Sequence, residues 1–146
     1  MLDFIDLTGL PMAELRKRLA ALPEKSAIVY TAINVDGAGV VYIPRDALVA
    51  FADAANSPIL IDSETMVGYG GAGGFVASPT ALAKETALLA FRVLKGEPAS
   101  MIPISIGQLK PIFDWRQLQR WGVSEARLPP GSDIRFRPLT AWEQYQ

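Results

Sequence analysis

An unbroken apolar run at residues 26–33, Ser-Ala-Ile-Val-Tyr-Thr-Ala-Ile, is the feature that most restricts the fold. It is rich in β-branched residues and does not alternate with polar ones, which is typical of a strand covered on both faces. Such strands occur mainly in parallel sheets that are flanked by helices. The run therefore predicts an α/β fold.

Strand-like and helical segments alternate around this run. Residues 2–7 alternate imperfectly between apolar and acidic positions and predict a short strand. Residues 11–22 and 44–55 carry apolar side chains every three or four positions and predict two amphipathic helices. Residues 58–61 predict a buried strand. The order strand, helix, strand, helix, strand is typical of right-handed crossovers that build a parallel sheet.

The second half of the chain continues this pattern. Ser78 followed by Pro79 predicts the start of a long helix that runs to Lys95 and ends at Gly96. Its apolar positions are spread widely around the axis, so we expect it to pack on more than one side.

Two further elements and a tail follow. Residues 101–106 predict a last core strand, and Asp114 predicts the cap of a short helix that ends before Gly122. Residues 132–146 have no clear period. We therefore expect a domain at residues 1–131 and a tail at residues 132–146.

Composition excludes several kinds of chemistry. The 146 residues include no Cys and no His, which excludes disulfides, thiolate nucleophiles, zinc–thiolate sites and Ser-His-Asp catalysis. Fourteen Lys and Arg against fifteen Asp and Glu leave a net charge of −1, so the chain lacks the basic excess of nucleic-acid-binding proteins. We therefore expect a binding module rather than an enzyme, with no cofactor, no metal and no nucleic-acid partner.

The ends of the predicted strands are the expected ligand-binding edge. Ligands of parallel α/β sheets bind beyond the carboxyl ends of the strands. The residues that we expect to bind a small polar solute there are Asn34, Asp36, Gly37, Asp62, Glu64, Thr65 and Tyr69. Acidic groups at neighbouring strand ends suit the hydroxyl or ammonium groups of a ligand. A carboxylate pair for catalysis or magnesium is an alternative, although no lysine, cysteine or histidine lies nearby in the sequence.

Structural roles are equally open for some of these residues. Asp36-Gly37 is also a common turn sequence, and Tyr69 is equally suited to a core position. Gly68, Gly70 and Gly73 match the G-x-G-x-x-G spacing of dinucleotide-binding loops. However, Phe75-Val-Ala77 separate the glycines from the next helix, which favours a flexible crossover over a nucleotide site.

Several motifs together resemble a known family. They are Asp36-Gly-Ala-Gly39, Ile43-Pro44-Arg45, Gly68-Tyr-Gly-Gly-Ala-Gly-Gly74, Ala90-Phe-Arg-Val-Leu-Lys-Gly96, Phe113-Asp-Trp-Arg-Gln-Leu118, Arg120-Trp-Gly122, Arg127-Leu-Pro-Pro-Gly131 and Trp142-Glu143. This set resembles the extracytoplasmic sensor region of a group of bacterial histidine kinases. That region is similar to the substrate-binding proteins of ABC transporters, which have the type I periplasmic binding fold.

The resemblance implies two α/β lobes, joined by three crossovers, that close around a solute. On that template residues 2–61 correspond to the later part of the C-terminal lobe, and residues 68–95 to a crossover with a strand and a helix that return to the N-terminal lobe. The chain would cross back from Pro103 onward. It would then be a fragment that lacks the N-terminal lobe, and its tail would lead towards a membrane helix.

The resemblance also implies a function. We expect a ligand-sensing fragment of a two-component sensor histidine kinase at the periplasmic face of the bacterial inner membrane, with signalling by lobe closure. The substrate-binding component of an ABC transporter is the alternative. Because the helix at residues 78–95 would face a missing lobe, we expect the fragment to dimerise or to exchange this helix between copies.

Overall fold

The computed structural model describes residues 2–104 and 107–138. The helices are α1 (Met12–Ala20), α2 (Pro44–Ala52), α3 (Pro79–Leu94) and α4 (Trp115–Arg120), with short 3-10 turns η1 (Glu64–Met66), η2 (Ala99–Met101) and η3 (Glu125–Arg127). The strands are β1 (Ile28–Tyr30), β2 (Ile59–Ile61), β3 (Gly73–Ala77), β4 (Leu109–Asp114) and β5 (Asp133–Arg135).

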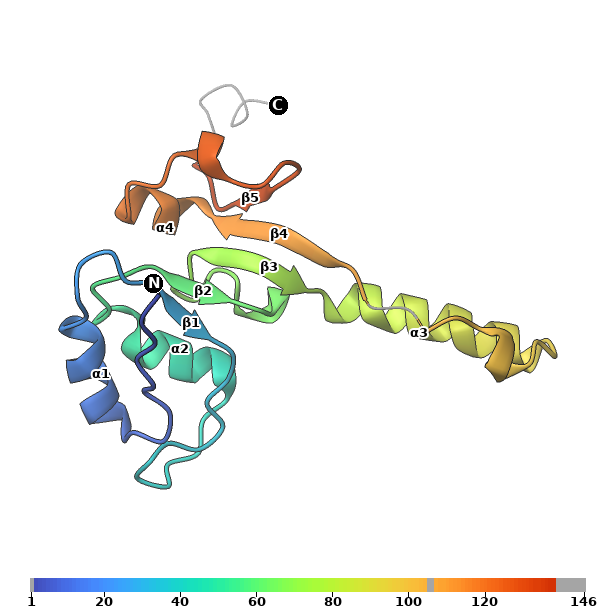
Figure 1. Cartoon of the computed structure of the whole chain (residues 1–146), viewed down its shortest axis with the longest axis horizontal. Helices are drawn as coiled ribbons and strands as arrows, with labels where there is room; N and C mark the ends of the chain where they lie inside the picture. Colours follow the sequence, from blue (N-terminus) through green and yellow to red (C-terminus); the bar gives the residue numbers. More distant parts are fainter. Residues whose placement is uncertain (1, 105–106, 139–146) are drawn as a thin grey trace.

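The five strands form one sheet in the order β1-β2-β3-β4-β5 (Figure 1). β1, β2 and β3 are parallel, with Ile28 opposite Ile59 and Leu60 opposite Gly73. β4 runs antiparallel to β3, and β5 runs parallel to β4. The prediction of an α/β fold with a mostly parallel sheet and flanking helices is confirmed.

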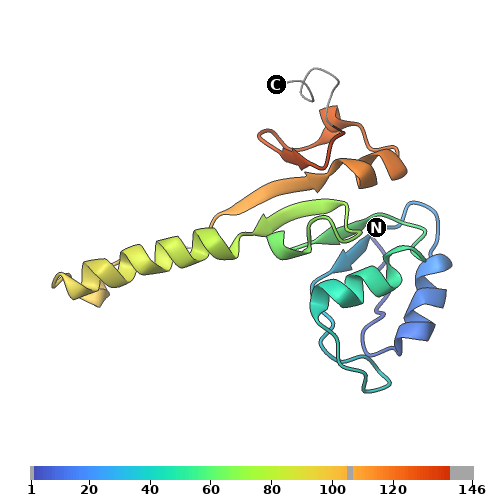
Figure 2. The same cartoon turned by 180° about the vertical axis from the view of Figure 1, so that it is seen from behind.

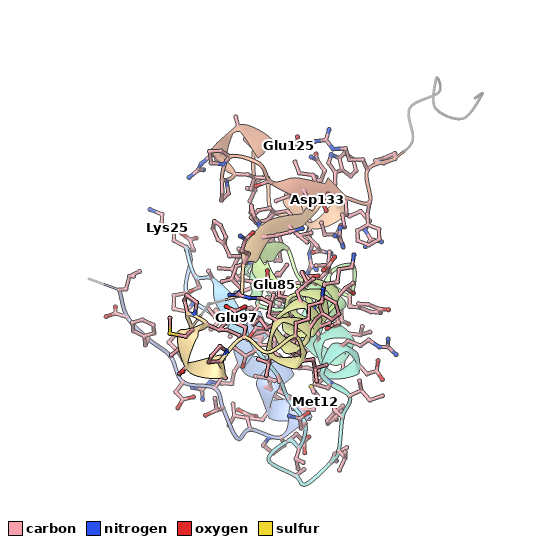
Figure 3. The ribbon with its side chains drawn as sticks, turned by 90° about the vertical axis from the view of Figure 1, so that its right-hand side faces the viewer. Met12, Lys25, Glu85, Glu97, Glu125 and Asp133 are labelled. Atoms are coloured by element: carbon pink, nitrogen blue, oxygen red, sulfur yellow. The ribbon has the colours of Figure 1, made fainter. Side chains whose placement is uncertain are left out.

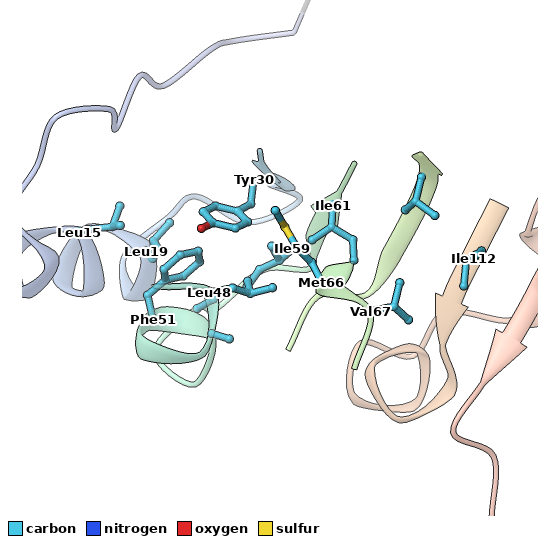
Figure 4. Packing of buried hydrophobic residues seen from close by; sticks show 13 residues of the cluster. Leu15, Leu19, Tyr30, Leu48, Phe51, Ile59, Ile61, Met66, Val67 and Ile112 are labelled. Atoms are coloured by element: carbon cyan, nitrogen blue, oxygen red, sulfur yellow. The ribbon is translucent and has the colours of Figure 1, made fainter. Parts of the chain in front are cut away.

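The core lies on one face of this sheet. Each of α1 and α2 buries one apolar stripe, which includes Leu19 in α1 and Phe51 in α2. Figure 4 shows these side chains together with those from the strands, and the rings of Tyr30 and Phe51 meet edge to face at 5.2 Å between centroids. The crossover from β2 to β3 adds Met66 to the same cluster.

The opposite face of the sheet is open over much of its area, although Phe113, which the register places on the same face, is buried. Val29 lies opposite Leu60, and the side chains of Phe75 and Leu109 reach the same face through the register of β3 and β4. All four are exposed, Val29 by 76%. The expectation that residues 26–33 form a strand covered on both faces is therefore wrong in the described chain, where the strand spans residues 28–30. We call Val29, Leu60, Phe75 and Leu109 the open face.

Two predicted strands are absent from the described chain. Residues 2–7 are irregular and pair with no strand of the described chain, and Phe4 is 93% exposed. In place of the strand expected at residues 101–106, the chain forms η2 and then an irregular segment in which Ile104 is fully exposed. Pro103 has no N–H to donate to a sheet. Residues 105 and 106 lie outside the described residues.

Helix α3 begins and ends at the predicted signals. The Ser78 hydroxyl accepts the Ala81 N–H at 3.4 Å, and Gly96 follows the helix with φ +98°. In the described chain, however, α3 buries none of its residues, so the expectation that it packs on more than one side is wrong there. Figures 1 and 2 show it as an arm that extends away from the sheet. Figure 3 views the molecule almost along this arm. In that view Glu85 and Glu97 appear near the middle, with Asp133 above them and Met12 below.

The C-terminal part of the described chain contributes α4 and the edge strand β5. Asp114 caps α4 as predicted, by accepting the Arg116 N–H at 3.0 Å. β5 comes from the segment that was expected to be a tail and that has no clear period in the sequence, while residues 139–146 lie outside the described part. The domain division at residue 131 stays a prediction. Within residues 2–104 and 107–138, no helix is both long and apolar enough to cross a membrane.

Candidate functional site

Tyr30, the last residue of β1, fixes the start of α2. Its hydroxyl donates to the Pro44 carbonyl at 2.6 Å and accepts the Ile33 N–H at 3.1 Å. Burial raises the pKa of the Tyr30 phenol, because the anionic form would lose its hydration. The hydroxyl therefore stays protonated and holds the first turn of α2 beside the end of β1.

A groove of about 350 Å³ lies at this position. It is lined by Ile43, Pro44, Arg45, Thr65 and Met66. The first three residues begin α2, and the last two belong to η1, which follows β2. The carboxyl-end groove, as we call it, thus lies beyond the carboxyl ends of β1 and β2, the edge where parallel sheets bind ligands.

Arg45 and Tyr69 lie together beside this groove. The guanidinium carbon of Arg45 is 5.5 Å from the centroid of the Tyr69 ring, within the range of a cation–π contact. Its Nε donates to the Asp46 carboxylate at 3.3 Å. Arg45 is the one charged residue among the five that line the groove. Its guanidinium is therefore the cation of the groove, and the Asp46 carboxylate beside it offsets part of that charge.

The predicted site residues Asp36 and Gly37 serve the start of α1. The Asp36 carboxylate accepts three backbone N–H groups, from Met12, Ala38 and Val40, each at 2.9 Å. These hydrogen bonds, that of Met12 foremost, lower the pKa of Asp36. The Gly37 N–H donates to the Leu10 carbonyl at 3.0 Å. These contacts fit the structural interpretation of the Asp-Gly turn, and a role of either residue in ligand binding stays a prediction.

Asn34 and Asp62 are exposed at the carboxyl edge. Their backbone carbonyls accept hydrogen bonds, that of Asn34 from Tyr42 at 2.9 Å and that of Asp62 from Ala77 at 2.8 Å. These contacts close the turn after β1 and join the ends of β2 and β3. The side chains remain accessible to a solute.

Glu64 faces the C-terminal strand. Its carboxylate accepts a hydrogen bond from Arg135 at 2.7 Å, and hydrogen bonds from Ser78 and Arg135 lower its pKa. Its neighbour Thr65 shares a hydrogen bond of 2.9 Å with the Ser63 hydroxyl. Glu64 thus joins the β2–β3 crossover to β5, whereas Thr65 lines the groove.

The structure brings only part of the predicted set to one place. Thr65 lines the carboxyl-end groove and Tyr69 lies beside it through Arg45, whereas Asp36 and Gly37 contact the start of α1. Arg45 was missed as a candidate site residue. The signal that points to it is the Pro44 that starts a helix after an apolar strand, which places the next side chain at the carboxyl edge.

The glycine run makes a tight crossover rather than a nucleotide loop. Gly70 and Gly73 have φ of +108° and +123°, and a Cβ at Gly70 would lie 2.5 Å from the Cβ of Ala52. Gly73 begins strand β3, whereas the dinucleotide-binding motif needs a helix that starts within the glycines. Close backbone approach and positive φ therefore explain these glycines, as the sequence favoured.

No family model, curated protein or solved structure matches the chain. In the described part of the chain, acidic side chains do not gather in a group of three or more that could hold a metal ion.

Proposed function

We propose that this chain is the later part of a ligand-sensing domain of the type I periplasmic binding kind, in a bacterial two-component sensor histidine kinase. It would lie at the periplasmic face of the inner membrane, bind a small solute and catalyse no reaction itself. The observation that carries the proposal is that α3 leaves the sheet at the ligand-binding edge and buries no residue in the described chain.

The position of α3 supports a second lobe. In a two-lobe binding protein the solute lies between the lobes, so the connections between the lobes leave from the edge where the ligand binds. α3 follows β3 at Ser78, and Ala77 pairs with Ser63 directly beside η1 and the carboxyl-end groove. The exposed apolar side chains of Leu88, Phe91 and Leu94 suit burial against that lobe.

The open face supports the same proposal. Parallel sheets are as a rule covered on both faces. Here the described chain covers one face with α1, α2 and the β2–β3 crossover, while Val29 and Phe75 remain exposed on the other. A larger domain, of which this chain supplies one part, would cover these side chains.

A route for signalling runs from the groove to the C-terminal strand. The β2–β3 crossover carries Thr65 at the groove and contacts the C-terminal segment through Glu64 and Arg135. Arg116 donates to the Gly68 carbonyl at 3.2 Å and lies 4.3 Å from the Phe136 ring centroid. Ligand binding that shifts the crossover would therefore be transmitted to the segment that leaves the domain. A full switch from 1:99 to 99:1 needs about 5.5 kcal/mol of differential binding.

A titration of the isotopically labelled chain with single solutes tests the binding function by amide NMR shifts. The panel contains a polyol, a zwitterionic amino acid, an aliphatic and an aromatic carboxylic acid, an amine, NAD and ATP. We expect at least one small solute to move the amides of residues 43–46 and 64–69. Thr65→Val should weaken the binding of that solute. Thr80→Val, at an exposed position in the first turn of α3, should leave its binding unchanged.

Two results would contradict this function. One is that no solute moves these amides, either in this chain or in the complete two-lobe domain, and the other is that NAD or ATP binds at residues 68–74 instead. The coding sequence downstream of Gln146 separates the two parent proteins. A membrane helix and a kinase core agree with the sensor, whereas a stop codon agrees with the alternative of an ABC-transporter substrate-binding component.

A further inference from the structure

We propose that the carboxyl-end groove binds an organic acid through its carboxylate, with an apolar or aromatic body lying in the groove. Arg45 would bind the carboxylate, and Met66 and Tyr69 would contact the body. This inference rests on the proposed function, since it assigns a ligand class to the same edge of the sheet.

The charge of the groove supports an anion. Of the five lining residues, Arg45 is cationic, and the other four are a hydroxyl residue, Thr65, and the apolar Ile43, Pro44 and Met66. A guanidinium presents paired N–H donors that match both oxygens of a carboxylate. The Thr65 hydroxyl can donate a further hydrogen bond when Ser63 is the donor in the pair that the two hydroxyls form.

Arg45 is available to a ligand. Its side chain is 51% exposed, and within the described chain its hydrogen bond to Asp46 uses Nε and leaves both Nη groups without a protein acceptor. Asp46 occupies only Nε, so a ligand carboxylate can bind both Nη groups without displacing it.

The guanidinium is also held in place. The Tyr69 ring lies 5.5 Å from it, and the hydrogen bond from Tyr30 to Pro44 fixes the backbone directly before it. A cation held in position loses less conformational entropy on binding than a freely rotating one. This arrangement favours recognition of a charged group at one defined point.

Two of the three acidic side chains expected to bind a ligand are engaged elsewhere, and the third, that of Asp62, is exposed but does not line the groove. Asp36 accepts three backbone N–H groups near α1, and Glu64 is paired with Arg135. Neither carboxylate lines the groove. The groove therefore suits an anion, rather than the hydroxyl or ammonium groups that the sequence suggested.

The rest of the lining selects the body of the ligand. Ile43, Pro44 and Met66 present apolar surface, and a methionine side chain adapts to ligands of different shape. The exposed ring of Tyr69 adds an aromatic surface beside the guanidinium. A carboxylate with a planar or branched apolar body fits this combination.

Benzoate, benzamide and benzylamine provide a matched test, because they share a ring and differ in charge. Each is titrated into the labelled chain in a sodium chloride buffer, and amide NMR shifts report the site and the Kd. We expect benzoate to bind at residues 43–46 and 64–69, and benzamide to bind about tenfold more weakly because it lacks the charge-assisted pair. Benzylamine should bind more weakly still.

Variants of arginine test the assigned cation. Arg45→Gln should remove the preference of the groove for benzoate over benzamide, and Arg45→Lys should retain part of it. Arg18→Gln, on the exposed side of α1, is the matched control and should retain the full preference.

Each other outcome overturns the inference in a recognisable way. Equal binding of benzoate and benzamide, stronger binding of benzylamine, or an unchanged preference in Arg45→Gln would overturn the carboxylate assignment and leave the proposed binding function standing. Displacement of benzoate by an equal concentration of added chloride would show that charge alone determines binding. It would overturn the assignment of an apolar body to the ligand. If none of the three probes moves these amides but another solute of the wider panel does, the ligand class is wrong. If no solute moves them in this chain or in the complete two-lobe domain, the binding function fails as well.

Discussion

Asp36 stabilises the turn before α1 through three backbone hydrogen bonds, and replacing its carboxylate tests this role. Asp36→Asn keeps the size of the side chain but replaces one acceptor oxygen with an NH2 group, which leaves one of the backbone N–H groups without its acceptor. We expect the thermal midpoint at pH 7 to fall by about 5 °C. Circular dichroism measures this change. Asp3→Asn, at an exposed position, is the control and should leave the midpoint unchanged.

The same carboxylate makes stability depend on pH. The hydrogen bonds hold the pKa of Asp36 below its ordinary value in the folded chain. Its stabilisation is therefore fully present above about pH 4, the ordinary pKa of an aspartate, and is lost as the pH falls through the lower folded pKa. Urea midpoints of the wild type and of Asp36→Asn should converge between about pH 4 and pH 2. A constant difference over this range would contradict the assignment.

Gly37 and Gly39 are required for different structural reasons, the first for close packing and the second for a positive φ. A Cβ at Gly37 would lie 2.1 Å from the Gly9 carbonyl oxygen, so Gly37→Ala must displace backbone at the start of α1. We expect it to lower the free energy of unfolding by about 2–3 kcal/mol. A Cβ at Gly39 meets open space, but its φ is +81°, so Gly39→Ala should cost about 1 kcal/mol. Equal losses in urea unfolding would argue against this packing.

At the scale of elements, the ion pair between Glu64 and Arg135 ties β5 to the β2–β3 crossover. β5 is a short edge strand, so losing this contact should increase its local opening. For a partly exposed pair we expect a cost of about 0.5–1 kcal/mol, which corresponds to amide exchange about two- to fivefold faster in residues 133–135 of Glu64→Gln. Glu97→Gln breaks a comparable pair with Arg92 at the C-terminal end of α3, and it should leave the amide exchange of β5 unchanged. Equal exchange of β5 in all three proteins would show that the ion pair does not hold the strand.

Helices were more predictable than strands because their signals are local. Ser78 and Asp114 mark the starts of α3 and α4 through their own side chains. Each accepts a hydrogen bond from a backbone N–H only two or three residues later. A strand needs a partner, which a short apolar pattern does not specify. Residues 2–7 and 101–106 have strand-like composition and no partner in the described chain, whereas residues 133–135 lack a clear pattern and pair with β4.

The candidate site was predictable in its place more than in its chemistry. Parallel topology places the groove at the carboxyl edge, where Thr65 and Tyr69 were expected. The charge of the groove depends on contacts between distant positions. Asp36 accepts the N–H of Met12, 24 residues earlier, and Arg45 lies over the ring of Tyr69, 24 residues later. Such contacts are set by tertiary packing and have no signal in local sequence.

At the scale of the whole molecule, two apolar surfaces lack cover in the described chain. One is the open face of the sheet and the other is the arm formed by α3 (Figure 1), where Leu94 is 84% exposed. Contiguous exposed apolar surfaces mark sites of association. A helix that extends from the body is accessible to a second copy without rearrangement of the core, so α3 is the surface that we expect to associate first.

We therefore expect the isolated chain to dimerise through α3, by side-by-side packing or by exchange of the arm. Size-exclusion chromatography with light scattering at tens of micromolar should give about twice the 15.8 kDa of one chain. Replacing both Leu88 and Leu94 with Glu should yield monomers, because two charges would be buried unpaired in the contact. Ala83→Glu adds a charge at an exposed position of α3 without removing a large apolar side chain, and it should remain a dimer.

Two results would exclude α3 as the contact. One is a wild-type chain that is monomeric at these concentrations. The other is a dimer that persists in the double variant and dissociates in Phe75→Glu, since Phe75 lies on the open face and not on the arm. That second result would place the association on the sheet, where covering Val29 and Leu60 together would provide the driving force. The two surfaces thus give opposite responses to one pair of variants, so a single set of mass measurements distinguishes them.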